Sequence, residues 1–202
     1  MYNTLARFIV AKLRIEENDS DKKEICEYGL EILIAYIFYF VFFIMLSVIT
    51  STFLESIAFL IGFMLLRNFA GGFHANTYLK CHLIFGINHI LFIALIYFVP
   101  TDLYIAINIP VSIMCVGLIL MLAPIDHKNR RFTKGEYKYF RTASVICACF
   151  VILLGPLSII LVFCRAWSFY FLLGFASATC SLVAGKIQAR LERDIKHDAL
   201  DK

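Results

Sequence analysis

The sequence predicts an all-α fold: a polytopic membrane bundle of about six transmembrane helices, preceded by an N-terminal amphipathic helix. Its 202 residues are 61% hydrophobic and only 17% charged, whereas soluble domains are about half apolar and a quarter charged. Several windows of about 20 residues carry no charge, which is the length that a helix needs to cross a bilayer. The basic residues also gather in alternate loops. These three observations together indicate a multi-pass membrane protein.

The same composition excludes several other classes of protein. A chain of this size cannot bury so much apolar surface as an ordinary soluble domain. Most of the seven cysteines lie in or beside apolar runs, where Cys behaves as a small hydrophobic residue. No CxxC pair is present, so we expect neither a structural zinc site nor another metal or cofactor. The first residues lack the short apolar core of a cleavable signal peptide, and nothing indicates nucleic-acid binding.

Residues 1–20 are expected to form the amphipathic helix. Leu5, Phe8, Ile9 and Leu13 recur at helical spacing, with basic residues among them. Such a helix can lie on the anionic surface of a membrane leaflet, or it can simply pack beneath the bundle. We expect the remainder, residues 21–202, to form a single transmembrane domain.

Within that domain, the predicted spans cover about residues 29–50, 53–66, 82–100, 103–123, 142–163 and 167–185. The extent of the second span is open, because the apolar piece at residues 56–66 would be only about 17 Å long as a helix. Three explanations stay open: the helix continues through Arg67 and Asn68, the membrane is thin there, or the segment is partly re-entrant.

The distribution of Lys and Arg predicts the orientation. With six spans, every basic residue except Arg165 lies in the two termini or in the even-numbered loops. Cytoplasmic loops carry the excess of basic residues in membrane proteins. We therefore expect both termini, and the functional face, on the cytosolic side of the membrane.

The densest group of polar residues that hydrophobicity does not require is residues 67–82, between the second and third spans. His74 and Cys81 form a candidate catalytic pair there, because an imidazole can take the proton of a cysteine nucleophile. On one continuous helix their backbones would be about 10 Å apart, which is too far for a direct hydrogen bond. The alternative is an interfacial histidine and an inert thiol, and His82 is a competing base.

The residues around this pair suggest how it could be brought together. Gly71 and Gly72 permit backbone conformations that a helix interior does not use, and Asn76 or Thr77 could cap the following helix. Cys81 would then lie near a helix N-terminus, where the dipole favours an anion. Arg67 adds positive charge that could stabilise a thiolate or an oxyanion.

Glu31 is a second candidate, since it falls about where the first span enters the hydrocarbon. A carboxylate at that depth must face a cavity or a partner. It could orient His74 or bind substrate, or it could be a snorkelling interfacial residue. Asn88 and His89 lie deeper in the third span, where a hydrogen bond within the bundle is the simpler explanation.

These residues resemble the signature of the accessory gene regulator B (AgrB) family of membrane peptidases. The resemblance is carried by Arg67, Gly71, Gly72, His74 and Ala75, with Cys81 seven residues after the histidine. It extends to residues 28–31 and 123–130 and covers nearly the whole chain. It implies a cysteine endopeptidase in which Cys81 is the nucleophile and His74 the base.

The resemblance also implies a substrate and a product. The substrate would be a short AgrD-like propeptide with an acidic C-terminal tail, processed into a cyclic autoinducing peptide for quorum sensing. Lys128, Arg130 and Arg131 fall where the family has a cationic loop implicated in processing, and Glu31 falls at a functionally important polar position. The lipid bilayer is the other expected partner, and a homodimer is left open.

Two readings without catalysis compete with this one. A small exporter of peptide or lipid would explain the hydrophobicity together with Asn88 and His89. A membrane scaffold for a sensor kinase would make no demand on any cysteine. Neither of them explains the Gly-Gly-x-His sequence at the expected cytosolic edge.

Overall fold

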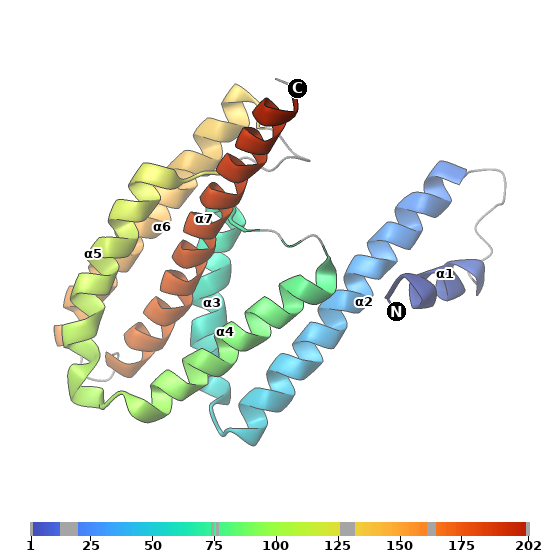
Figure 1. The fold of residues 1–202 in the computed structure, drawn as a ribbon. Coiled ribbons are helices and arrows are strands. Elements are labelled where there is room, and N and C mark those ends of the chain that lie inside the picture. The colour runs from blue at the N-terminus through green and yellow to red at the C-terminus, as the bar shows by residue number, and fades with distance from the viewer. Residues whose placement is uncertain are drawn as a thin grey trace. The chain divides into compact units, whose positions relative to one another are not determined.

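The computed structural model describes residues 2–12, 20–73, 75, 77–125, 132–160 and 165–200. Within these ranges the chain forms helices and no β-strand, which confirms the all-α prediction (Figure 1). The elements are α1 (Tyr2–Lys12), α2 (Ser20–Ile49), α3 (Phe53–Ala70), α4 (Tyr78–Phe98), the short 3-10 helix η1 (Thr101–Leu103), α5 (Tyr104–Leu122), α6 (Lys134–Ile160) and α7 (Arg165–Leu200).

Six of these helices are long and apolar enough to cross a membrane. The candidate spans in the described part of the chain are Ile25–Ile49, Phe53–Ala70, Lys80–Phe98, Thr101–Leu122, Lys134–Leu154 and Arg165–Glu192. The predicted number of about six is therefore confirmed. The division into residues 1–20 and 21–202 stays a prediction.

α3 answers one question that the sequence left open. It continues through Arg67 and Asn68 to Ala70, so it has 18 residues and is about 27 Å long. That length is close to the bilayer core of about 30 Å. The charged Arg67 can lie inside this helix because its side chain has hydrogen-bond partners, which are described below.

The chain divides into two compact units, which are described separately. The first unit holds Met1–Ser51 and Ala75–His89, and the second holds Thr52–His74 and Ile90–Lys202. The first part of α4 therefore belongs to the first unit and its remainder to the second.

In the first unit, α1 packs against α2. Ala6 and Val10 are buried, and Arg7 forms an ion pair with Glu27 of α2 at 3.5 Å. Whether α1 also lies on the surface of a membrane leaflet stays a prediction. Leu5 and Phe8 of α1 are exposed, which leaves an apolar face available to lipid.

In the second unit, α3 and α7 approach until their backbones touch (Figure 1). A Cβ atom added to Gly62 would lie 2.1 Å from the Phe171 carbonyl oxygen, and one added to Gly174 would lie 1.9 Å from the Phe59 carbonyl oxygen. Small residues let membrane helices pack this closely when lipid is as apolar as the side chains. Around this contact, α3, α5, α6 and α7 bury a common core that includes Leu66, Ile119, Val151, Phe175 and Leu182.

Candidate active site

The end of α3 carries the first part of the predicted site, in the second unit. The half-buried Arg67 donates one hydrogen bond from Nη1 to the Ser181 hydroxyl of α7 at 3.1 Å. It donates another from Nη2 to the Phe73 carbonyl oxygen. The guanidinium thus joins α3, α7 and the segment that follows α3. That its charge also stabilises a thiolate or an oxyanion stays a prediction.

Gly71 and Gly72 both need to be glycine. Their φ angles are +74° and +144°, a region that residues with a Cβ atom rarely adopt. Space is also lacking, because a Cβ on Gly72 would lie 2.0 Å from Nη1 of Arg67. A Cβ on Gly185 of α7 would lie 2.6 Å from the carbonyl carbon of Gly72. The two glycines therefore let the chain lie directly against the α7 backbone.

Backbone hydrogen bonds hold the same segment from both sides. The Phe73 N–H donates to the Ser181 carbonyl oxygen at 2.8 Å, and the Ile125 N–H donates to the Ala70 carbonyl oxygen at 3.1 Å. Together with the Arg67 side chain, these bonds fix residues 70–73, which we call the Gly-Gly clamp. The clamp ends one residue before His74.

Several predicted site residues lie outside the described residues. They are His74, Lys128, Arg130 and Arg131. The pairing of His74 with Cys81, and the role of the basic loop, therefore stay predictions.

Cys81 lies in the first unit, in the first turn of α4. Thr77 caps this helix, since its hydroxyl accepts a hydrogen bond from the Lys80 N–H at 3.3 Å. It is one of the two residues that the sequence predicted as the cap. The Cys81 N–H donates to the Thr77 carbonyl oxygen at 3.1 Å. The thiol is half-buried and is not part of a disulfide. It is close to the end of the helix that attracts anions.

On α2, the residues on this side recur every four positions and form a single face. His82 Nε2 donates a hydrogen bond to the Ala35 carbonyl oxygen at 3.3 Å, and Phe43 stacks on His89 with ring centroids 4.2 Å apart. Both histidines thus take part in the packing of α2 on α4. Glu31 begins the same face, is half-buried and forms no side-chain hydrogen bond or ion pair with the part of the chain described.

Tyr39 lies on this face between Ala35 and Phe43, and no motif singles it out among the many aromatic residues. Its ring contacts those of His82 and Phe85 edge-on, at centroid distances of 5.5 Å and 4.9 Å. Its hydroxyl is buried and has no hydrogen-bond partner among the described residues. Only the structure identifies this group.

A polar cavity of about 330 Å³ opens beside the Gly-Gly clamp in the second unit. Its walls are the chain from Met121 to Ile125, Tyr137 and Arg141 of α6, and Lys186 and Ala189 of α7. Arg141 donates to the carbonyl oxygens of Ile119, Leu120 and Ala123, which caps the C-terminus of α5. Lys186 has no side-chain partner in the described ranges. The charged groups of the lining are both positive and would attract an anion.

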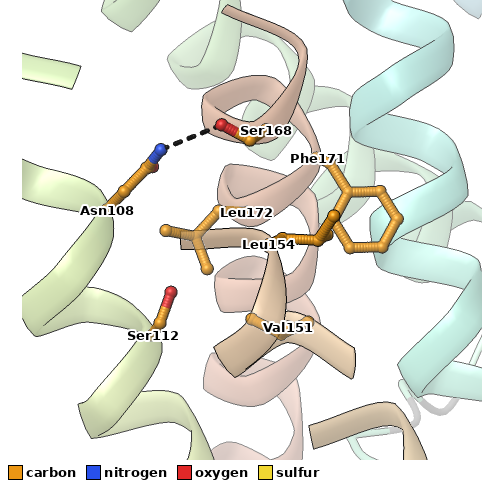
Figure 2. A pocket seen from close by; sticks show the side chains of 7 residues that line it. All are labelled: Asn108, Ser112, Val151, Leu154, Ser168, Phe171 and Leu172. Carbon is orange, nitrogen blue, oxygen red and sulfur yellow. Dashed lines mark hydrogen bonds between the residues drawn. The ribbon is translucent and has the colours of Figure 1, made fainter. Parts of the chain in front are cut away.

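A second cavity lies inside the second unit between α5, α6 and α7 (Figure 2). Its volume is about 10 Å³, which is room for about one water molecule. Asn108 donates to the Ser168 hydroxyl there at 3.2 Å. The size of this cavity excludes a peptide substrate.

Comparison with known proteins identifies the family of the chain. The family model described as accessory gene regulator B matches residues 2–184. "Putative AgrB-like protein 2" of Clostridium perfringens (strain 13 / Type A) is 27% identical over 175 residues, which are 83% of this chain and 82% of that protein. "Putative AgrB-like protein" of strain SM101 / Type A is 27% identical over 179 residues, with 83% and 82% covered. No solved structure matches. Because the family match spans most of the chain and six helices can cross a membrane, this multi-pass membrane protein belongs to the accessory gene regulator B family.

Proposed function

We propose that the protein is a membrane-embedded cysteine endopeptidase that cleaves a short AgrD-like propeptide and closes part of it into a cyclic thiolactone or lactone. Cys81 is the nucleophile and His74 its base. The position of Cys81 carries this proposal: a half-buried thiol in the first turn of a helix capped by Thr77. A helix N-terminus stabilises an anion by roughly 0.3–1 kcal/mol, which favours the thiolate.

The reaction has two steps that conserve atoms and charge. His74 takes the Cys81 proton, the sulfur attacks the scissile carbonyl carbon, and the C–N bond breaks as His74 protonates the leaving amine. A Cys or Ser side chain of the propeptide then attacks the acyl-thioester. As the new S–C or O–C bond closes the ring, His74 takes the proton of the attacking group and returns it to the leaving Cys81 sulfur. Excluding water from the site favours ring closure over hydrolysis.

The Gly-Gly clamp supports the assignment of His74. Phe73 is fixed by the Ser181 carbonyl oxygen and by Arg67, and His74 is the next residue in the chain. A base has to be held in a productive geometry to be effective, and small displacements are costly. The clamp supplies a rigid start for the segment that carries this histidine.

The polar cavity supports a binding site for the acidic tail of the propeptide. Lys186 and Arg141 line it, and the cavity borders the Gly-Gly clamp through Ile125. We propose that this face lies in the cytosol, as the distribution of basic residues predicts. Lys128, Arg130 and Arg131 would add to the same positive field, and Glu31 would bind a donor group of the substrate.

Co-expression with candidate propeptides, followed by mass measurement of the products, tests the enzymatic proposal. Cys81→Ala, Cys81→Ser and His74→Ala should abolish cleavage while the protein still inserts in the membrane. His82→Gln is the matched control, because an amide can keep the hydrogen bond to Ala35 but cannot act as a base. Full cleavage by Cys81→Ala would overturn the assignment.

A thiol-reactive probe separates the enzyme from an exporter. Cys26 is exposed, whereas Cys81 is half-buried, so accessibility alone predicts faster labelling of Cys26. An activated nucleophile reverses that order. Labelling of Cys81 that is slower than that of Cys26, and insensitive to His74→Ala, would favour a non-catalytic protein.

A further inference from the structure

The unpaired hydroxyl of Tyr39 is a feature of the first unit that packing does not explain. It is buried among α2 and α4 and has no hydrogen-bond partner in the described chain. Leaving a buried donor unpaired is unfavourable. His82 shows the usual alternative, since its Nε2 bonds to the Ala35 carbonyl oxygen. A phenylalanine at position 39 would make the same ring contacts without this penalty.

The packing of Tyr39 places its ring against the first turns of α4. Its ring lies edge-on to the rings of His82 and Phe85. His82 is the residue after Cys81, and Phe85 follows Cys81 by about one helical turn. Cys81 lies in these same first turns of α4, and no hydrogen bond joins its thiol to the Tyr39 hydroxyl within the described structure. The packing thus places an unused donor against the part of α4 that carries the proposed nucleophile.

We propose that the Tyr39 hydroxyl donates a hydrogen bond to the carbonyl oxygen of the substrate while Cys81 adds to the carbonyl carbon. This inference rests on the proposed function. As the S–C bond forms, the π electrons of the carbonyl move to its oxygen, and a pre-placed donor stabilises that charge. A phenol keeps its proton near neutral pH, so Tyr39 donates without transferring the proton. The substrate oxygen supplies the partner that the resting protein lacks.

Tyr39→Phe is the test, because it removes the hydroxyl and keeps the ring. With the propeptide that the wild-type protein cleaves, the single-turnover cleavage rate should fall by about 10²-fold or more, as when other oxyanion donors are removed. The rate at which iodoacetamide alkylates Cys81, and its pH profile, should not change. The melting temperature should stay the same or rise, since an unpaired donor is lost.

Tyr36→Phe is the matched control. Tyr36 lies on the same helix and also contacts the His82 ring, at 6.4 Å between centroids, but the residue is 53% exposed. Its substitution should leave cleavage unchanged. Wild-type cleavage by Tyr39→Phe would overturn the proposal. An equal loss of Cys81 alkylation would also overturn it, because the hydroxyl would then act on the Cys81 thiolate and not on the substrate. A lower melting temperature would overturn it too, because the hydroxyl would then have a structural role. Cleavage by Cys81→Ala would instead contradict the proposed function itself.

Discussion

The guanidinium of Arg67 donates a hydrogen bond to the Ser181 hydroxyl, 3.1 Å away, and so joins the end of α3 to α7. The same side chain also holds the Phe73 carbonyl oxygen. Its planar fork can satisfy two acceptors in different directions, which an ammonium group does with less precision. The segment before His74 is therefore fixed by an arginine that membrane hydropathy alone would place outside the span.

Arg67→Lys should impair cleavage more than Ser181→Ala. The lysine keeps the charge but loses the fork, whereas Ser181→Ala removes one of the two acceptors and leaves the Phe73 bond in place. If His74 is the base that activates Cys81, as proposed, Cys81 alkylation by iodoacetamide should fall with the cleavage rate. If cleavage falls while alkylation stays at the wild-type rate, Arg67 does not act through this histidine.

Gly72→Ala should lower the cleavage rate by about 10²-fold, the loss that a displacement of about 1 Å can cause in an active site. The new Cβ would lie 2.0 Å from Nη1 of Arg67, at a φ angle that disfavours alanine. Gly135→Ala is the control, because nothing lies within 4 Å of its added Cβ. Equal rates for the two variants would show that the Gly-Gly clamp does not position the chemistry.

Gly174→Ala should destabilise the second unit by about 1–3 kcal/mol, the usual cost of overpacking a core. Its Cβ would lie 1.9 Å from the Phe59 carbonyl oxygen and would force α3 away from α7. Gly117→Ala has open space around it and should be neutral or stabilising, since alanine is the better helix former. Thermal melting in detergent measures both, and a Gly174→Ala protein as stable as Gly117→Ala would contradict the close backbone contact.

Lys186→Glu should raise the KM for the propeptide about tenfold, equivalent to about 1.4 kcal/mol, with little change in kcat. Reversing acidic residues of the propeptide tail to lysine should restore binding. Lys138→Glu is the matched control, since Lys138 is exposed on α6 and is not among the residues that line the cavity. A KM for Lys186→Glu equal to that of Lys138→Glu would remove the cavity from the substrate path.

The spans could be predicted from the sequence because the cost of placing charge in hydrocarbon is local to each window. The end of α3 could not, because Arg67 is stabilised there by bonds to Ser181 and Phe73, residues from other parts of the fold. The backbone contact of Gly174 with Phe59 was equally hidden, since it depends on which helices become neighbours.

The candidate site shows the same division. The Thr77 cap and the place of Cys81 in the first turn follow from local helix-capping rules, so the sequence indicated both. Tyr39 differs from the other aromatic residues of α2 only in what surrounds its hydroxyl. No pattern of residue types carries that information.

The acyl-thioester on Cys81 is the central chemical claim, and trapping it is the most direct test. The protein should be mixed with its propeptide, quenched in acid and measured intact by mass spectrometry. We expect an added mass equal to the propeptide without its C-terminal leaving segment, located on the peptide that contains Cys81, released by hydroxylamine and absent from Cys81→Ala. Cleavage that proceeds with no such adduct, or with an adduct on another cysteine, would contradict the claim.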